Sequence, residues 1–159
     1  MDFDQAFDRL ISNEGGYVNN PADPGGETNW GISKRSYPHV DIKNLTRELA
    51  RQIYLADFWR RGQMDQYDQA IAFQVFDIAV NSGIETAVRL LQRAAGVADD
   101  GHIGPVTVAA IKTKSVTDML MLITAERLDF WRRLSTWPQF GKGWAGRAAT
   151  DLRYAAQDS

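Results

Sequence analysis

The segment DQAIAFQVFDIAVNSG, residues 68–83, constrains the fold more than any other part of the sequence. It is typical of a helix that is apolar on nearly all sides, and Gly83 is expected to end it. Such a helix must be surrounded by other elements, so we expect it at the centre of a small domain. No long alternating strand pattern occurs in the chain. The sequence therefore predicts a mainly α fold, with at most a small β-hairpin near residues 15–35.

Helical spacing and capping signals predict further helices on both sides of this segment. Thr46 is expected to cap a helix that runs to Phe58. Other helices are predicted over residues 4–13 and 85–95, from Pro105, from Ser115 or Thr117 to about Leu134, and over residues 145–156. The sequence WPQFGKGW, residues 137–144, is predicted to be a loop. A mild change of composition near residues 96–104 divides the chain into two parts, 1–95 and 96–159, that we expect to pack together.

Composition and charge exclude several kinds of site and partner. The formal net charge is −2 at pH 7 without a long run of Lys or Arg, which argues against general binding to nucleic acid. The absence of cysteine excludes disulfides, thiolate metal sites and cysteine nucleophiles. His39 and His102 are too few and too isolated for a metal site. No segment approaches the ~20 apolar residues of a membrane span. We expect neither a metal nor a cofactor, and we expect a monomer.

Glu14 stands where a carboxyl group is unusual. On a helical wheel of residues 4–13 it continues the apolar stripe that contains Phe3 and Phe7, so its side chain is expected to point inward. It also lies at the C-terminal end of the predicted helix, where the helix dipole disfavours negative charge. Both effects raise the pKa of the carboxyl group, which suits a general acid. The pattern alone fits a buried carboxylate paired with an arginine equally well, and Arg147 is one candidate partner.

The loop after Glu14 combines the side chains that sugars need. Tyr17 and Trp30 offer rings on which sugar faces stack, and Thr28 offers a hydroxyl group. Asp23 and Glu27 each offer a second carboxylate. Glycoside hydrolysis requires an acid and a second group that holds water or stabilises positive charge. Asp23 also fits a simple turn, because it lies within Pro-Ala-Asp-Pro-Gly.

A line of polar residues crosses the apolar central helix. Gln74, Asp77 and Asn81 are spaced i, i+3, i+7, so they lie close to one face. We predict that this face forms the floor of a cleft in which Asp77 and Asn81 bind substrate. The same side chains could instead anchor a loop or cap a helix.

Residues 13–33, NEGGYVNNPADPGGETNWGIS, closely resemble the signature of glycoside hydrolase family 108, the N-acetylmuramidases of phage endolysins and bacterial secretion systems. FDIAVNSG resembles the central helix of that family, and LQRAAGVADDGHIGPVTVAAI resembles the small peptidoglycan-binding module that usually follows. The resemblance covers roughly residues 5–155. It implies a lysozyme-like helical fold, with a catalytic region at 1–95 and a peptidoglycan-binding-like region at 96–159.

The resemblance also implies a reaction. The substrate would be the glycan strands of bacterial peptidoglycan, cut at the β-1,4 bond between N-acetylmuramic acid and N-acetylglucosamine, with Glu14 as the catalytic acid. Similar phage lysozymes have a Glu, eight residues, an Asp, five residues and a Thr. Asp23 fits that spacing, whereas Thr28 follows after only four residues. By this analogy Asp23 and Thr28 position the attacking water, although Thr28 could instead only shape the loop.

Two other activities fit the same residues. A lytic transglycosylase would use the same Glu, with a hydroxyl group of the sugar attacking in place of water. A non-catalytic wall-binding protein would keep only the shape. The N-terminus, MDFDQAFDRLISNE, lacks the basic and apolar regions of a signal peptide. We therefore expect synthesis in the cytoplasm and action in the periplasm or cell wall after release through a holin or another exporter.

Overall fold

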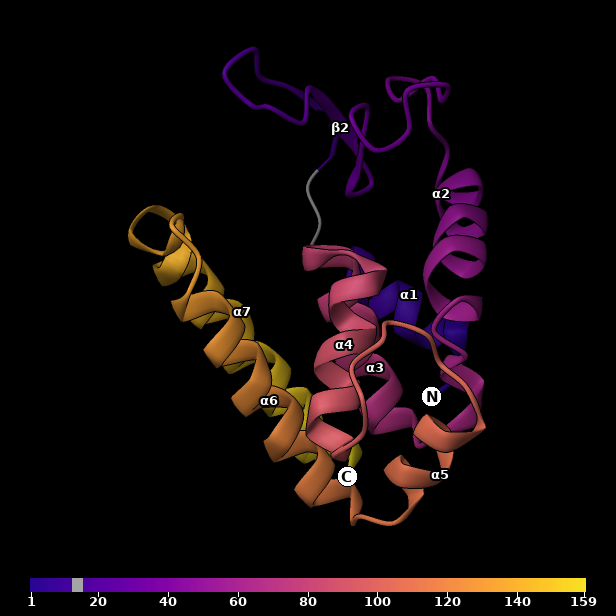
Figure 1. The fold of residues 1–159 in the computed structure, drawn as a ribbon. Helices are drawn as coiled ribbons and strands as arrows, with labels where there is room; N and C mark the ends of the chain where they lie inside the picture. Colours follow the sequence, from indigo (N-terminus) through magenta and orange to yellow (C-terminus); the bar gives the residue numbers. More distant parts are fainter. Residues whose placement is uncertain (13–15) are drawn as a thin grey trace. The chain divides into compact units, whose positions relative to one another are not determined.

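The computed structural model describes residues 1–12 and 16–159, and its fold is drawn in Figure 1. The chain divides into two compact units, Met1–Trp59 and Arg60–Ser159, and each is described here by itself. Helices dominate both units, and the one sheet among the described residues belongs to the first. The prediction of a mainly α fold is confirmed.

Both helices α1 and α2 of the N-terminal unit begin directly after a capping residue. α1 (Phe3–Ile11) follows the N-cap Asp2, and its apolar face is buried. α2 (Arg47–Tyr54) begins after Thr46, whose hydroxyl oxygen accepts a backbone hydrogen bond in the first turn, as predicted. The helix then continues directly into a π-helical segment, η1 (Leu55–Arg60).

Aromatic rings join α1 to the α2–η1 helix. The ring centroids of Phe7 and Tyr54 lie 5.8 Å apart, and those of Phe3 and Trp59 lie 5.5 Å apart. The guanidinium carbon of Arg51 lies 5.3 Å from the Phe3 ring centroid. These contacts fix α1 against α2, so the chain leaves α1 from a defined position.

Three short strands form an antiparallel sheet in the order β1–β2–β3. They are β1 (Val18–Asn19), β2 (Glu27–Asn29) and β3 (Ile32–Ser33). The sheet exceeds the predicted hairpin by one strand. It is tied to the segment before α2, because the buried amide of Asn29 donates a hydrogen bond to the Ile42 carbonyl oxygen at 3.0 Å.

The central helix of the C-terminal unit is α3 (Gln69–Ser82), and every residue from Ala70 to Ala79 is buried. Gly83 ends it with a φ of 92°, a conformation that favours glycine, so the predicted end is confirmed. α3 packs against the three longest neighbouring helices of this unit (Figure 1). The remaining elements are η2 (Met64–Gln66), α4 (Ile84–Ala95), α5 (Pro105–Lys112), α6 (Val116–Arg132) and α7 (Trp137–Asp158).

α7 contradicts one prediction, because it begins at Trp137 and includes residues 137–144, which were expected to form a loop. The ring of Trp137 lies so close to Gly141 that an added Cβ there would come within 2.6 Å of it. Trp144 stacks on Trp131 of α6, with ring centroids 5.7 Å apart. Aromatic packing thus compensates for the low helix propensity of glycine.

The loop between α4 and α5 is organised by one buried glutamine. The side-chain nitrogen of Gln92 donates hydrogen bonds to Asp100 Oδ1 (2.9 Å), the His102 carbonyl oxygen (3.0 Å) and Thr107 Oγ1 (3.2 Å). Its side-chain oxygen accepts a hydrogen bond from Gly101 N at 2.9 Å. The glutamine therefore replaces regular secondary structure as the support of this loop.

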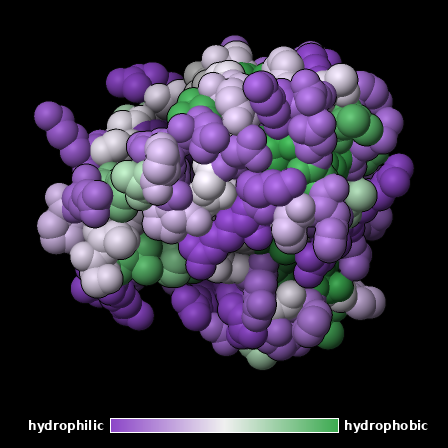
Figure 2. All heavy atoms as spheres, turned by 90° about the horizontal axis from the view of Figure 1, so that it is seen from above, coloured by the Kyte–Doolittle hydropathy of each residue, from purple (hydrophilic) through white to green (hydrophobic). Residues whose placement is uncertain are grey.

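No helix within the described ranges is long and apolar enough to cross a membrane. On the face drawn in Figure 2, hydrophilic side chains predominate and hydrophobic ones are scattered between them.

Replacing Gln92 with Leu should lower the free energy of unfolding by about 1–3 kcal/mol, because the Gly101 amide and neighbouring oxygens lose their buried partner. Urea denaturation followed by circular dichroism measures this change. The exposed Gln157→Leu variant is the matched control. Equal stability of the two variants would contradict a supporting role for Gln92.

Candidate active site

The sheet separates the predicted site residues of the N-terminal unit onto two faces. Neighbouring residues of a strand point to opposite faces, so Glu27 and Thr28 of β2 face different ways. The Tyr17 hydroxyl group donates a hydrogen bond to Glu27 Oε1 at 2.7 Å. This bond raises the pKa of Tyr17. Tyr17 therefore belongs with Glu27, on the face opposite Thr28.

Asp23 and Thr28 both lie near Ser33. Thr28 pairs with Ser33 across the sheet. A Cβ added to Gly25 would lie 3.2 Å from Asp23 Oδ1 and 3.7 Å from the Ser33 Cβ. The Asp23 carboxylate and the Thr28 strand position therefore both lie near Ser33, and a shared catalytic role for them stays a prediction.

The Asp23 carboxylate also shapes its own loop. Its Oδ1 accepts a hydrogen bond from Gly25 N at 2.8 Å, and its carbonyl oxygen accepts one from Gly26 N at 3.0 Å. Asp23 is exposed to solvent, so its carboxylate both shapes the turn and remains accessible to a ligand.

Trp30 occupies an unusual backbone position. Trp30 and Gly31 join β2 to β3 with φ angles of 54° and 76°, where a bulky residue costs ~1–3 kcal/mol. Two hydrogen bonds hold it there: Trp30 Nε1 donates to the Leu45 carbonyl oxygen (2.9 Å), and the Tyr54 hydroxyl group donates to the Trp30 carbonyl oxygen (2.8 Å). The half-buried indole ring is therefore fixed relative to the sheet and α2.

Glu14 lies outside the described residues. The described helix α1 ends at Ile11, with Ser12 as its C-cap. Its position on the apolar stripe and its raised pKa stay predictions.

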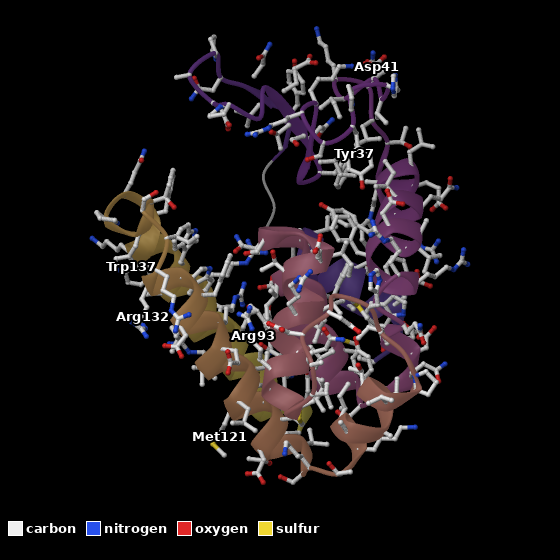
Figure 3. All side chains as sticks on the ribbon, in the orientation of Figure 1. Tyr37, Asp41, Arg93, Met121, Arg132 and Trp137 are labelled. Atoms are coloured by element: carbon white, nitrogen blue, oxygen red, sulfur yellow. The ribbon has the colours of Figure 1, made fainter. Side chains whose placement is uncertain are left out.

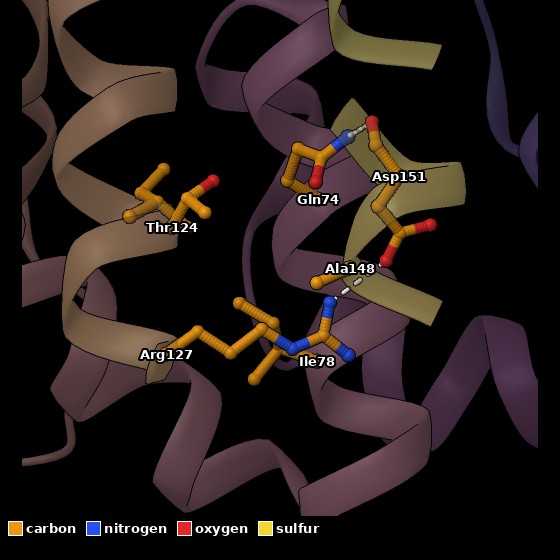
Figure 4. Close-up of a pocket in the computed structure, with 7 residues that line it drawn as sticks. Gln74, Ile78, Thr124, Arg127, Ala148 and Asp151 are labelled. Atoms are coloured by element: carbon orange, nitrogen blue, oxygen red, sulfur yellow. Dashed lines mark hydrogen bonds and ion pairs between the residues drawn. The ribbon is translucent and has the colours of Figure 1, made fainter. Parts of the chain in front are cut away.

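Asp77 is bound by two arginines in the C-terminal unit. Arg127 Nη2 donates to Asp77 Oδ2 at 2.9 Å, and Arg147 Nη2 donates to Asp77 Oδ1 at 2.7 Å. Arg127 Nη1 also donates to Asp151 Oδ2 at 2.7 Å, and Gln74 Nε2 donates to the Asp151 carbonyl oxygen at 2.8 Å (Figure 4). These contacts give Asp77 an ion-pairing role, and substrate contact by Asp77 stays a prediction.

The cavity beside this cluster is too small for a sugar. Its volume is about 10 Å³, and Gln74, Arg127 and Asp151 are among its lining residues (Figure 4). Small-molecule sites usually measure ~300–1,000 Å³. Asn81, in contrast, is exposed at the end of α3, where its Oδ1 accepts a hydrogen bond from Ser82 Oγ at 3.1 Å. A substrate contact by Asn81 is sterically open and stays a prediction.

The pKa values of the two buried carboxyl groups, Asp77 and Asp151, are shifted in opposite directions. Burial opposes ionisation of Asp77, but a hydrogen bond with Asp151 and the guanidinium groups of Arg147 and Arg127 hold its pKa below the usual range. Burial and the adjacent Asp77 raise the pKa of Asp151 to about 8. Asp151 thus keeps a proton near neutral pH while Asp77 is ionised.

Sequence reasoning missed Arg127 and Asp151 as partners of Asp77. A buried acidic residue on an apolar helix requires a cationic partner, so the sequence could have predicted that Asp77 pairs with an arginine or a lysine. It could not identify the cation, because Arg127 and Arg147 come from two helices far along the chain.

Comparison with known proteins gives the chain a family. Residues 7–83 match the Glycosyl hydrolase 108 model, and residues 86–149 match a model described as a predicted peptidoglycan domain. SagA of Brucella abortus is 33% identical in sequence, with a TM-score of 0.91, and the match covers 99% of this chain and 95% of SagA. The chain belongs to the glycosyl hydrolase 108 family.

This glycosyl hydrolase 108 protein is a peptidoglycan hydrolase, as the resemblance implied, and its fold is lysozyme-like. No curated protein sequence matches it. The predicted division into 1–95 and 96–159 stays a prediction.

The charge state of Asp151 predicts a pH dependence of stability. The folded protein binds a proton at Asp151 that the unfolded chain releases above its ordinary pKa of 3.8. The contribution is therefore full below pH ~4, and stability is lost as pH rises toward 8, by up to ~1.4 kcal/mol per pH unit. In urea denaturation between pH 5 and 9, Asp151→Asn should flatten this slope.

The exposed Asp129→Asn variant should keep the wild-type slope, because Asp129 pairs with Arg132 on the surface of α6. An unchanged slope in Asp151→Asn would show that Asp151 is ionised in the folded protein.

Proposed function

We propose that this protein is an N-acetylmuramidase that cleaves the β-1,4 bond between N-acetylmuramic acid and N-acetylglucosamine in bacterial peptidoglycan, with Glu14 as general acid. The observation that carries the proposal is the family match over residues 7–83, which spans Glu14 and the whole sheet. Because the substrate is peptidoglycan, the enzyme would act in the bacterial cell wall. It would be an enzyme of phage or bacterial origin.

The sheet supports the second half of the reaction. After Glu14 protonates the glycosidic oxygen, the sugar ring develops positive charge and a water must attack it. Asp23 offers an exposed carboxylate beside Ser33, the strand partner of Thr28. A carboxylate can stabilise the charge and orient the water, and the Thr28 hydroxyl group can hold the same water.

The aromatic residues support the proposed binding of the glycan strand. Trp30 is held rigidly by two hydrogen bonds, and Tyr17 by one. Rings that are fixed before the substrate arrives lose little conformational entropy on binding. Stacking of sugar faces on these rings would orient the glycan strand relative to Glu14.

Replacing Glu14 with Gln should reduce hydrolysis of purified peptidoglycan by about 10²–10⁴-fold, since the amide cannot donate the acid proton. Turbidity clearing and zymography measure the loss, and circular dichroism should show an unchanged fold. Glu48→Gln, at an exposed glutamate in the first turn of α2, is the matched control. Clearing at near wild-type rate by the Glu14 variant would refute the assignment.

Mass spectrometry of the products decides which bond breaks and how. N-acetylmuramic acid at new reducing ends, convertible to the alditol by borohydride, is the expected result. N-acetylglucosamine at those ends would refute the bond specificity. Anhydro ends that resist borohydride would identify a lytic transglycosylase instead.

Asp23→Asn should separate the two roles of Asp23. The asparagine side-chain oxygen can still accept the Gly25 N–H, so the turn is kept while the charge is lost. We expect at least ~10-fold lower turnover with unchanged stability. Wild-type turnover in Asp23→Asn, together with loss in Asp23→Ala, would limit Asp23 to shaping the loop.

A further inference from the structure

The end of the α6–α7 helix pair has an unusual composition. We call residues 130–146 the α6–α7 tip; they comprise the end of α6, the turn and the first part of α7. Three of the five tryptophans of the chain lie in it. Its aromatic residues are Phe130, Trp131, Trp137, Phe140 and Trp144. None of these residues was a predicted site residue.

The rings of the tip form a continuous stack that starts in the core. The guanidinium carbon of Arg127 lies 4.5 Å from the ring centroid of the buried Trp131. Trp144 stacks on Trp131 with an interplanar angle of 19°, and Phe140 stacks on Trp144 at 5.9 Å. Trp137 contacts Trp144 from another side at 6.0 Å. The buried ion pairs of Arg127 therefore hold the outer rings in place.

The outer end of the stack faces solvent. Phe140 remains 46% exposed although it stacks on Trp144. Trp137, which is labelled in Figure 3, is half-buried. Gly143 and Gly146 leave open space, since a Cβ added to either would meet no atom within 4 Å. Packing therefore does not require these two glycines, and their effect is to leave the surface beside the rings bare.

The tip is also strongly basic. Residues 130–146 contain Arg132, Arg133 and Lys142 and no acidic residue, whereas the whole chain has a net charge of −2. Arg132 pairs with Asp129 on the surface. Within the described part of the chain, neither Arg133 nor Lys142 forms an ion pair, so both cations are available to an anionic ligand.

We propose that the α6–α7 tip is the surface on which this protein holds peptidoglycan strands. Faces of N-acetylated sugars stack on Phe140 and the neighbouring rings, and the carboxylates of the stem peptides pair with Arg133 and Lys142. The choice of this ligand rests on the proposed function. It agrees with the match of residues 86–149 to a predicted peptidoglycan domain, which includes the tip without assigning any residue in it.

A pocket at the edge of the tip could bind the stem peptide of such a strand. Arg133 and Phe130 line it together with Arg93 and Glu126, and its volume is about 360 Å³. Its charges of both signs suit a peptide that carries carboxylates and an amino group. A strand stacked on the rings can thus place its peptide branch in the pocket.

An anionic lipid bilayer would also be attracted to the basic tip. The tip, however, lacks the broad apolar face that insertion into a bilayer requires. Of its five aromatic side chains, only that of Phe140 is largely exposed to solvent. A single exposed ring beside bare glycines suits a narrow, ridged sugar chain better than a lipid surface.

Sedimentation with insoluble peptidoglycan sacculi tests the proposal, in the Glu14→Gln protein so that the strands stay intact. Phe140→Ala and Phe140→Leu should each weaken binding by about 3- to 10-fold, and Phe140→Tyr should bind like the parent. Lys142→Gln should weaken binding and reduce its salt dependence. Leu128→Ala on α6, where the native side chain is 45% exposed, and Arg153→Gln on α7 are the matched controls.

Binding equal to the parent in both Phe140→Ala and Phe140→Leu would overturn the proposal. So would loss in Phe140→Ala alone, since Leu would then replace the ring by ordinary apolar contact. A parallel arm with phosphatidylglycerol–phosphatidylethanolamine vesicles identifies a membrane surface: loss of vesicle binding with unchanged sacculus binding would also overturn the proposal. Sugar release by the Glu14→Gln parent is assayed separately, so failure of the proposed function is distinguishable from failure of the tip.

Discussion

The buried carboxylate of Asp77 is the constraint on which the C-terminal unit depends. Burying one charge on the central helix α3 would be strongly unfavourable, so cations must approach it from the surrounding helices. Arg127 of α6 and Arg147 of α7 do so, and Arg127 also binds Asp151. A helix that slid or rotated on α3 would break these pairs. Polar contacts thus fix the register of helices whose apolar packing alone would permit alternatives.

That constraint reaches the surface through Arg127. Its guanidinium group donates hydrogen bonds to the carboxyl groups of Asp77 and Asp151, and its central carbon lies 4.5 Å from the Trp131 ring centroid. Trp131 supports Trp144, and Trp144 supports Phe140. A planar cation can serve both kinds of contact at once, whereas a lysine could not. The exposed rings of the α6–α7 tip therefore inherit their rigidity from the buried ion pairs.

The N-terminal unit is held together differently, because its loop region has few apolar side chains with which to form a core. Hydrogen bonds do the positioning there: Asn29 and Trp30 bind backbone oxygens of the segment before α2, and Tyr54 binds the Trp30 backbone. The strained Trp30 conformation persists because these bonds overdetermine it. A site built in this way presents its carboxylates and hydroxyl groups to solvent while its backbone stays fixed.

The sequence by itself determined the mainly α class, the capping of a helix at Thr46, the end of α3 at Gly83 and the peptidoglycan hydrolase family, because each depends on local pattern or on a contiguous motif. It named Asp23 both as a possible second carboxylate and as a turn residue, and the turn contacts are present. Only the tertiary structure decided the partners of Asp77 and the helical state of residues 137–144. The partners of Asp77, Arg127 and Arg147, lie 50 and 70 residues away in sequence. The helical state of residues 137–144 depends on the packing of Trp144 against Trp131 of another helix, which no local pattern encodes.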